Sequence, residues 1–210
     1  MTLTLREVSD EEILRACEIE VLAYKDNALG PIIAPGPFPS DALQQRSQQL
    51  AQGRKDDPTV SYLQAYDDAA GKMVAFAKWH IFETSASVAA STRPLVFGPG
   101  RNVEACQLFF GGMAERKEAI MGKKPHVYLS LLHTDPEFQG RGAGSLLLDW
   151  GKKKADELGL PIYLESSTAG HRLYQKHGFE DVEIFQADFT PYGGPIHDQP
   201  LMIRPAAKTQ

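Results

Sequence analysis

The segment Gln139-Gly140-Arg141-Gly142-Ala143-Gly144 has the residue types that bind a phosphate group. It follows the apolar run 127–132 and precedes Ser145 and three leucines, an order typical of a strand, a glycine loop and a helix start. Glycines let the backbone turn sharply and let a ligand come close. The first N–H groups of a helix have no partner within the helix and favour an anion. The spacing therefore predicts a phosphate site in this loop.

Two common phosphate motifs do not fit the loop. A nucleotide P-loop ends in Gly-Lys-Ser/Thr, whereas this loop reaches Ser145 without the lysine. A dinucleotide fingerprint that began at Gly140 would need its third glycine at Ser145. Glu165 does stand where a ribose-binding acid would be expected, but too few strand and helix units follow the loop to complete a doubly wound sheet. Both nucleotide interpretations are therefore disfavoured.

The elements that must position the loop follow from hydrophobic periodicity. Four prolines between Gly30 and Ser40 favour a surface loop, and residues 83–101 give no clear pattern. The sequence predicts strands over 3–8, 60–66, 73–82, 127–133, 162–165, 182–189 and 201–204. It predicts helices from a Ser9/Glu12 capping box to residue 23, and over 40–52, 102–121, 143–158 and 169–176. We expect a single α+β domain over residues 1–210.

Composition narrows the class of protein. The 210 residues are 42% hydrophobic and carry a formal net charge of −5, so the chain lacks the basic surface of a nucleic-acid binder. No segment approaches the roughly 18 apolar residues that span a bilayer, and the N-terminus does not resemble a leader peptide. Cys17 and Cys106 match no metal or redox spacing. These features predict a cytoplasmic protein with buried free thiols that binds no metal, membrane or nucleic acid.

Two motifs together point to a known family. Gln139-x-x-Gly142-x-Gly144, after an Asp135-Pro136 turn, resembles the acyl-CoA-binding motif of the GNAT superfamily of N-acetyltransferases. Leu173-Tyr174-Gln175-Lys176-His177-Gly178-Phe179 resembles the second signature of that superfamily, a short helix that carries a tyrosine and ends in Gly-Phe. The order and separation agree, and the resemblance is strong over about residues 126–180. Within it, Leu164-Glu165-Ser166-Ser167 looks most like fungal small-molecule acetyltransferases and the puromycin acetyltransferase type.

The resemblance implies both a fold and an activity. The fold is the GNAT fold, a mixed and mostly antiparallel twisted sheet of about six to seven strands flanked by four or more helices. The cofactor is acetyl-CoA, and the activity is transfer of its acetyl group to a small-molecule primary amine by direct attack in a ternary complex. A peptide or protein N-terminus, or a lysine, is the alternative acceptor, and a non-catalytic acyl-CoA sensor is the alternative class. We expect a monomer or a homodimer.

The resemblance also assigns residues to the cofactor. The strand that ends near Leu132 is expected to splay from its neighbour, so that its backbone pairs with the pantetheine arm. Tyr174 is the expected general acid, because a phenol with a pKa of about 10 can protonate a thiolate whose conjugate acid lies near 8.5. The expected cofactor contacts are Leu132, His133, Thr134, Gln139, Gly140, Arg141, Gly142, Ala143, Gly144, Ser145, Tyr174 and Lys176.

The general base and the acceptor site are less defined by sequence. Relatives often have a carboxylate or histidine at the positions of Tyr128 and Ser130, and this chain has neither. Glu165 is the candidate base, with His126 or His133 acting through water as alternatives. The surplus of acids in the chain hints at a cationic or neutral acceptor. The candidate acceptor contacts are Phe38, Trp79, His80, Tyr128, Ser130 and Tyr192.

Overall fold

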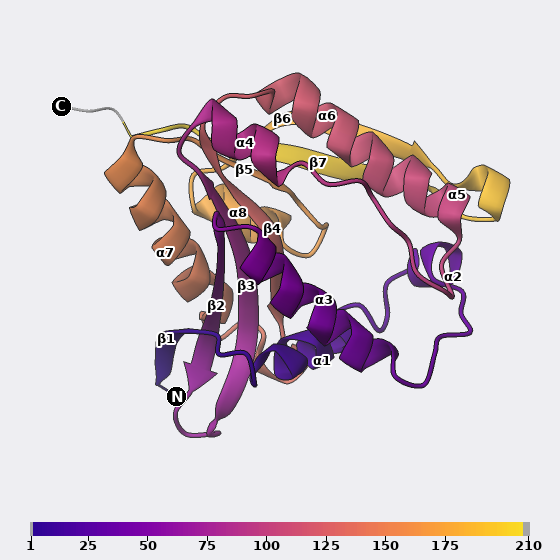
Figure 1. The fold of residues 1–210 in the computed structure, drawn as a ribbon, viewed down its shortest axis with the longest axis horizontal. Helices are drawn as coiled ribbons and strands as arrows, with labels where there is room; N and C mark the ends of the chain where they lie inside the picture. Colours follow the sequence, from indigo (N-terminus) through magenta and orange to yellow (C-terminus); the bar gives the residue numbers. More distant parts are fainter. Residues whose placement is uncertain (1, 208–210) are drawn as a thin grey trace.

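A computed structural model describes residues 2–207 as a seven-stranded twisted sheet with helices on both faces (Figure 1). The strand order is β1-β2-β3-β4-β5-β7-β6, and every neighbouring pair is antiparallel except β4 and β5, which are parallel. The strands are β1 (Leu3–Glu7), β2 (Val60–Asp67), β3 (Lys72–Phe82), β4 (His126–Thr134), β5 (Ile162–Glu165), β6 (Glu180–Asp188) and β7 (Ile196–Arg204). The expected mixed, mostly antiparallel sheet is confirmed.

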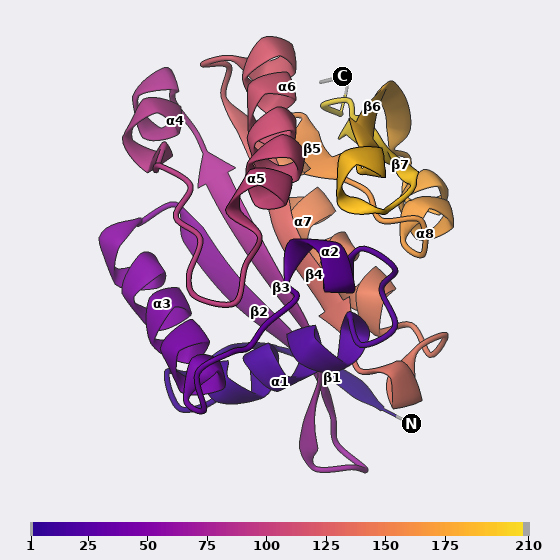
Figure 2. The same cartoon turned by 90° about the vertical axis from the view of Figure 1, so that its right-hand side faces the viewer.

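The helices divide between the two faces of the sheet (Figures 1 and 2). One face is covered by α7 and α8, and the other by α1 and α3 beside α5 and α6. The helices are α1 (Ile13–Ala23), α2 (Gly30–Ile33), α3 (Ala42–Asp56), α4 (Ser85–Ser91), α5 (Val103–Cys106), α6 (Gly112–Met121), α7 (Ala143–Leu158) and α8 (His171–Lys176). A π-helical turn, Gln107–Gly111, joins α5 to α6. None of these helices is long and apolar enough to cross a membrane.

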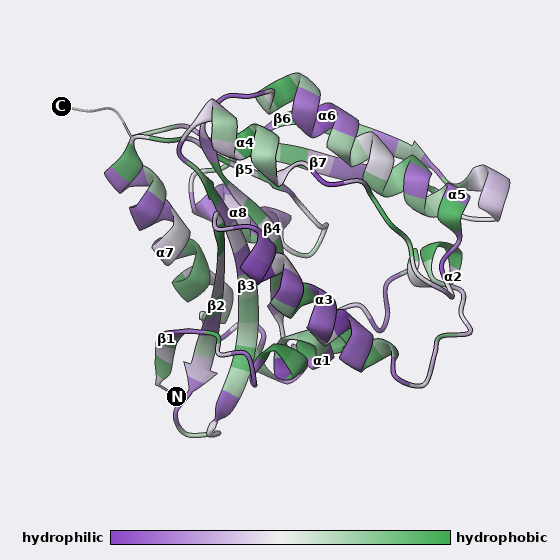
Figure 3. Cartoon of the chain, in the orientation of Figure 1, coloured by the Kyte–Doolittle hydropathy of each residue, from purple (hydrophilic) through white to green (hydrophobic). Residues whose placement is uncertain are grey.

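Strand β3 is buried on both faces because helices cover both sides of the sheet. Ala77 and Trp79 face α7, whereas Phe76 packs in the cluster that contains α1 and α3. The Trp79 ring lies so close to α7 that a Cβ at Gly151 would come within 2.3 Å of it. In Figure 3 strand β3 is mainly hydrophobic, while α3 is mainly hydrophilic along its visible length. Successive side chains of β3 thus point alternately to the α7 face and to the face covered by α1 and α3.

Several predicted boundaries are corrected by the structure. Pro31 does not prevent a helix in the proline-rich loop, because it lies in the first turn of α2, where its missing N–H is not needed. The expected capping box is only half formed: the Glu12 carboxylate accepts from the Ser9 N–H, but the Ser9 hydroxyl caps no backbone group and α1 begins at Ile13. Helix α3 runs four residues further than expected, to Asp56.

The C-terminal half shows smaller differences. The expected helix over 102–121 is interrupted by the π-helical turn, and the unassigned stretch 83–101 contains α4, whose N-terminus is capped by Thr84. The final strand begins at Ile196 rather than at residue 201, so that β6 and β7 form a long antiparallel pair. Cys17 and Cys106 are both free and buried, as predicted.

Candidate active site

Strands β4 and β5 separate at the level of a bulge in β4. Trp79 of β3 lies opposite Leu129 and Lys78 lies opposite Leu131, so Ser130 is an extra residue in β4. Pairing of β4 with β5 ends at Leu129 and Leu164, although β4 continues to Thr134. Among residues 2–207, the edge of β4 that faces β5 therefore has no partner strand beyond this point. Its free backbone groups match the expected place for an extended ligand arm.

The loop after β4 exposes the start of α7. Gly140 and Gly142 have φ of 72° and 91°, in the left-handed region that favours glycine. Helix α7 begins at Ala143, and no side chain caps its N-terminus. A Cβ at Gly140 or Gly142 would meet nothing within 4 Å, so the space in front of the helix is open. Uncapped N–H groups facing open space suit a diphosphate, and the residues present therefore fit coenzyme A.

Neighbouring side chains hold this loop in place. The buried Asp135 carboxylate bonds Arg15 of α1 at 2.6 Å and accepts from the Glu137 N–H at 3.2 Å. On the other side of the loop, the Ser145 hydroxyl lies 3.1 Å from Nε2 of His177. Arg15 was not predicted as part of the site, because it lies in no motif and more than a hundred residues before the loop. The loop is thus anchored from α1 and from the turn after α8.

Tyr174 projects from α8 into the core beside the loop. Tyr174 is 6% exposed, and the centroid of its ring lies 5.9 Å from that of the Phe179 ring. Burial raises the pKa of the Tyr174 phenol above its usual value, and the neighbouring Tyr24 adds to the shift. The hydroxyl makes no hydrogen bond to any other residue of the described chain. It is therefore protonated at neutral pH and free to donate to a ligand.

Tyr24, at the end of α1, was missed by sequence reasoning. Its hydroxyl lies 3.3 Å from Nε2 of His133, and the two rings meet edge to face with centroids 5.0 Å apart. Burial lowers the pKa of His133, so its imidazole is neutral. Because the His133 side chain turns toward α1, only its backbone can contact a ligand along the β4 edge. No sequence pattern marks Tyr24, which is simply the residue that ends an amphipathic helix.

Glu165, at the end of β5, lies within a hydrogen bond of Tyr128. The Tyr128 hydroxyl donates to Oε2 of Glu165 at 2.9 Å. Burial raises the pKa of the Glu165 carboxyl, although the nearby Lys117 and the Tyr128 hydrogen bond act in the opposite direction. Residue 128 of β4 is a tyrosine where relatives often have a carboxylate. The Glu165 carboxylate of β5 lies beside it. Its raised pKa suits a group that must accept a proton near neutral pH.

Two basic side chains, those of His80 and Lys117, contact the Tyr128 ring. The His80 ring stacks on Tyr128 with centroids 5.7 Å apart, and Nζ of Lys117 lies 4.2 Å from the centre of the Tyr128 ring. Nδ1 of His80 lies 3.5 Å from Asp57. Burial and the positive charges of Lys78 and Lys117 lower the pKa of His80 to about 3, so its imidazole is neutral.

The other residues predicted to contact the acceptor or the cofactor lie in several different parts of the structure. Trp79 does not belong to an acceptor wall: it is fully buried on the opposite face, because neighbouring residues of a strand point to opposite sides. Phe38 is half exposed near Arg101. Tyr192, in the turn before β7, packs against the same hydrophobic cluster as Tyr128. Lys176 is exposed in the last turn of α8. Ser130 lies at the bulge, where its hydroxyl bonds the Lys78 carbonyl at 3.3 Å.

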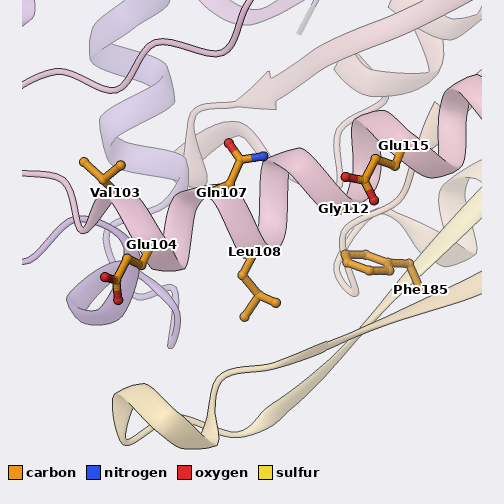
Figure 4. A pocket seen from close by; sticks show the side chains of 7 residues that line it. All are labelled: Val103, Glu104, Gln107, Leu108, Gly112, Glu115 and Phe185. Carbon is orange, nitrogen blue, oxygen red and sulfur yellow. The ribbon is translucent and has the colours of Figure 1, made fainter.

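A separate surface hollow of about 630 Å³ lies between the helix pair α5–α6 and strand β6 (Figure 4). Its lining residues are Val103, Glu104, Gln107, Leu108, Gly112, Glu115 and Phe185. None of them belongs to the loop, the β4 edge or the group around Tyr128. The hollow is therefore distinct from the candidate active site.

The chain is similar in sequence to known acetyltransferases. The model of the acetyltransferase (GNAT) family matches residues 32–179, which include the splayed strand, the loop and Tyr174. An uncharacterised N-acetyltransferase of Schizosaccharomyces pombe is 24% identical over 95% of this chain and 91% of its own length.

Solved structures agree on the fold. One from Corynebacterium glutamicum, described as histone acetyltransferase HPA2 and related acetyltransferase, covers 100% of this chain and 99% of its own, with a TM-score of 0.65 and 22% identity. A phosphinothricin acetyltransferase of Sinorhizobium meliloti in complex with acetyl-CoA covers 99% and 90%, with a TM-score of 0.60 and 16% identity. The chain belongs to the GNAT family of acetyltransferases and is an N-acetyltransferase.

Proposed function

We propose that this enzyme transfers the acetyl group of acetyl-CoA to a small-molecule primary amine by direct attack in a ternary complex. The proposal rests on one observation. The uncapped N-terminus of α7 and the unpaired edge of β4 lie close to the buried side chains of Tyr174 and Glu165. Backbone N–H groups after Gly142 would hold the diphosphate, and the β4 edge would hold the extended arm. Acetyl-CoA, when bound, supplies an activated acetyl thioester.

Glu165 acts as the general base in this proposal. An aliphatic amine has a pKa near 10 and must lose a proton before it can attack. Glu165 carries a raised pKa and keeps its position through the Tyr128 hydroxyl. Its carboxylate takes the proton, either directly or through one water. This assignment explains how the chain manages without an acid at the positions of Tyr128 and Ser130.

Tyr174 acts as the general acid. It lies on the α7 side of the sheet, in the cluster that also contains Leu147, next to the loop. Its phenol is protonated at neutral pH and has no competing hydrogen bond among the described residues. It is therefore ready to donate a proton to the leaving sulfur. The two catalytic side chains thus approach the β4 edge from opposite faces of the sheet.

A small acceptor is favoured over a protein acceptor by the cover on the Tyr128 face. Tyr128 lies between Lys117 of α6 and His80 of β3, and α1 and α3 pack over the adjoining part of the sheet. A protein substrate requires an open groove over the strands. Covered side chains of this kind instead suit a compact molecule, in line with the small-molecule subtype that the sequence suggested.

Acetyl-CoA turnover across a mixed panel tests this proposal. The panel contains aryl amines, polyamines, amino sugars, amino acids and peptides with varied N-terminal residues, and thiol release is followed together with the mass of the acetylated product. We expect acetylation of at least one small amine. If only peptides are acetylated, the acceptor class is wrong. If acetyl-CoA raises the melting temperature but nothing in the panel is acetylated, a non-catalytic sensor is favoured.

A further inference from the structure

Lys78 and Lys117 are unusual among the lysines of the described chain. Both are partly buried, on β3 and α6 respectively, and burial lowers the pKa of each. Neither ammonium has a carboxylate within the 4.0 Å of an ion pair in the part of the chain that the structure describes. Burying a positive charge without a partner costs free energy. The two ammonium groups can therefore accept an anionic group of a ligand at direct contact distance.

The nearby carboxylates are already engaged. Glu20 is paired with Arg46 through two contacts of 2.9 and 3.0 Å. Asp57 accepts hydrogen bonds from the Thr59 backbone and hydroxyl at 3.0 and 2.6 Å. Glu165 accepts from Tyr128. Although the whole chain has a surplus of acids, Lys78 and Lys117 have no carboxylate at ion-pair distance in the described chain. Asp57 and Glu20 attract Lys78, and Glu165 attracts Lys117, only at longer range. The charge of the whole chain is therefore a poor guide to the acceptor.

Lys78 lies on β3 and Glu165 at the end of β5, with β4 between them. Lys78 lies opposite Leu131, and Glu165 follows the pairing of Leu164 with Leu129. The two residues are thus nearly level, two strand spacings or roughly 10 Å apart. Lys78 shares its face of β3 with His80, and His80 stacks on Tyr128, to which Glu165 is bonded. A molecule whose amine reaches Glu165 can therefore reach Lys78 with a group only a few bonds away.

We propose that the acceptor is a small amine that also carries an anionic group, a carboxylate or a phosphate, which Lys78 and Lys117 bind. This inference rests on the proposed function, because it names the substrate class of the same site. Lys78 determines specificity rather than chemistry: it holds the anion while Glu165 receives the proton of the amine. Lys117, above the Tyr128 ring, faces the same group from α6.

Pairs of amines that differ only in the anion test the proposal. Suitable pairs are 4-aminobenzoate with aniline, phenylalanine with 2-phenylethylamine, 4-aminobutanoate with butylamine, and 2-aminoethyl phosphate with ethanolamine. We expect kcat/KM of the anionic member to exceed that of its neutral partner by about 10- to 100-fold in at least one pair, the range of a charge-assisted hydrogen bond. The carboxylate and phosphate pairs distinguish the two sources of the anion.

Lys78→Met removes the charge and keeps the length of the side chain. We expect it to abolish the preference by raising the KM of the anionic amine, with kcat and the KM of acetyl-CoA nearly unchanged. Its melting temperature should stay the same or rise, because a buried unpaired ammonium is removed. Lys78→Arg should keep the preference. Lys153→Met, at an exposed position of α7, removes the same charge. It should change neither the preference for the anionic amine nor the KM of that amine.

Three results would overturn the proposal. A neutral amine used as well as its anionic partner in every pair would refute it and leave the proposed function intact, since amines are still acetylated. A preference that survives in Lys78→Met would do the same. Failure to acetylate either member of any pair would refute the inference. It would refute the small-amine function as well if no other small amine of the wider panel is acetylated.

Discussion

The Tyr128 hydroxyl donates a 2.9 Å hydrogen bond to Glu165 across the parallel strands β4 and β5, just where their pairing ends. This contact brings a carboxylate to a strand position that lacks one in the sequence. It also lies beside the unpaired β4 edge, where the cofactor arm is proposed to bind. Glu165 is therefore the base in the mechanism that we propose.

Removing the carboxylate should remove the acidic limb of the pH profile. Glu165 has a raised pKa, so its base form increases as pH rises through that value, and kcat/KM should rise with it. The measurement uses an aryl amine that is neutral over the whole range, so that the acceptor itself does not titrate. The base then takes the proton that the amine nitrogen loses as it bonds to the acetyl carbon. Glu165→Gln should lower kcat by about 100-fold or more and flatten this limb. An unchanged limb in Glu165→Gln would assign it to another group.

Removing the phenol of Tyr174 should slow the reaction without weakening cofactor binding. Tyr174→Phe should lower kcat by about 100-fold, while the Kd of coenzyme A measured by calorimetry changes little. Tyr66→Phe is the matched control. The Tyr66 ring lies against Arg6 on β2, three strands away from Glu165 of β5, so loss of its hydroxyl should leave activity intact. Full turnover of Tyr174→Phe at every pH would show that Tyr174 is not the acid.

Substitution of Gly142 separates ligand approach from backbone strain. Gly142→Ala should weaken coenzyme A binding by about tenfold or more, because the new Cβ enters the open space in front of α7. It should also cost about 1–2 kcal/mol of folding free energy from the positive φ. Gly159→Ala, at the other end of α7 with φ of 65° and equally open surroundings, should cost similar stability and leave binding unchanged. Equal Kd values for both variants would place the diphosphate elsewhere.

The neutral His80 should make the protein less stable in mild acid. Its pKa falls to about 3 in the folded state from an ordinary value of 6.5, so the unfolded chain binds the proton more tightly. The stability due to this group is complete above pH 6.5 and is lost as pH falls toward 3, by about 2 kcal/mol at pH 5. Urea unfolding at pH 7 and pH 5 should show a smaller difference for His80→Gln than for the wild type. Equal differences would mean that His80 titrates normally.

The sequence predicted the strand, loop and helices around the proposed cofactor site well, because local chemistry determines them. The glycines of the loop, the helix that starts at Ala143 and the Tyr174 helix lie in one continuous stretch, and their spacing alone indicates their structure. The proposed acceptor half draws Lys78 from β3 and Lys117 from α6. No local pattern marks these two residues, and only the packing of α6 over the sheet brings Lys117 to Tyr128.

One error could have been avoided from sequence. Trp79 and His80 are adjacent on a strand, so both could not face one acceptor wall. The interruption of the helix before Met121 by a π-helical turn could not have been foreseen in this way, because it depends on how α6 packs against β6. Close approach at Gly112, where a Cβ would lie 2.4 Å from Phe185, is visible only in three dimensions.

The most direct test of the central claim is amine-dependent thiol release from acetyl-CoA by the wild-type enzyme and by Tyr174→Phe and Glu165→Gln, with product mass measured in parallel. The account predicts thiol release that requires an amine and matches the amount of acetylated product. It predicts that each variant releases thiol at least about tenfold more slowly while coenzyme A still raises its melting temperature. Thiol release at the wild-type rate in both variants would contradict the account, as would an enzyme that neither binds acetyl-CoA at millimolar concentration nor acetylates any amine.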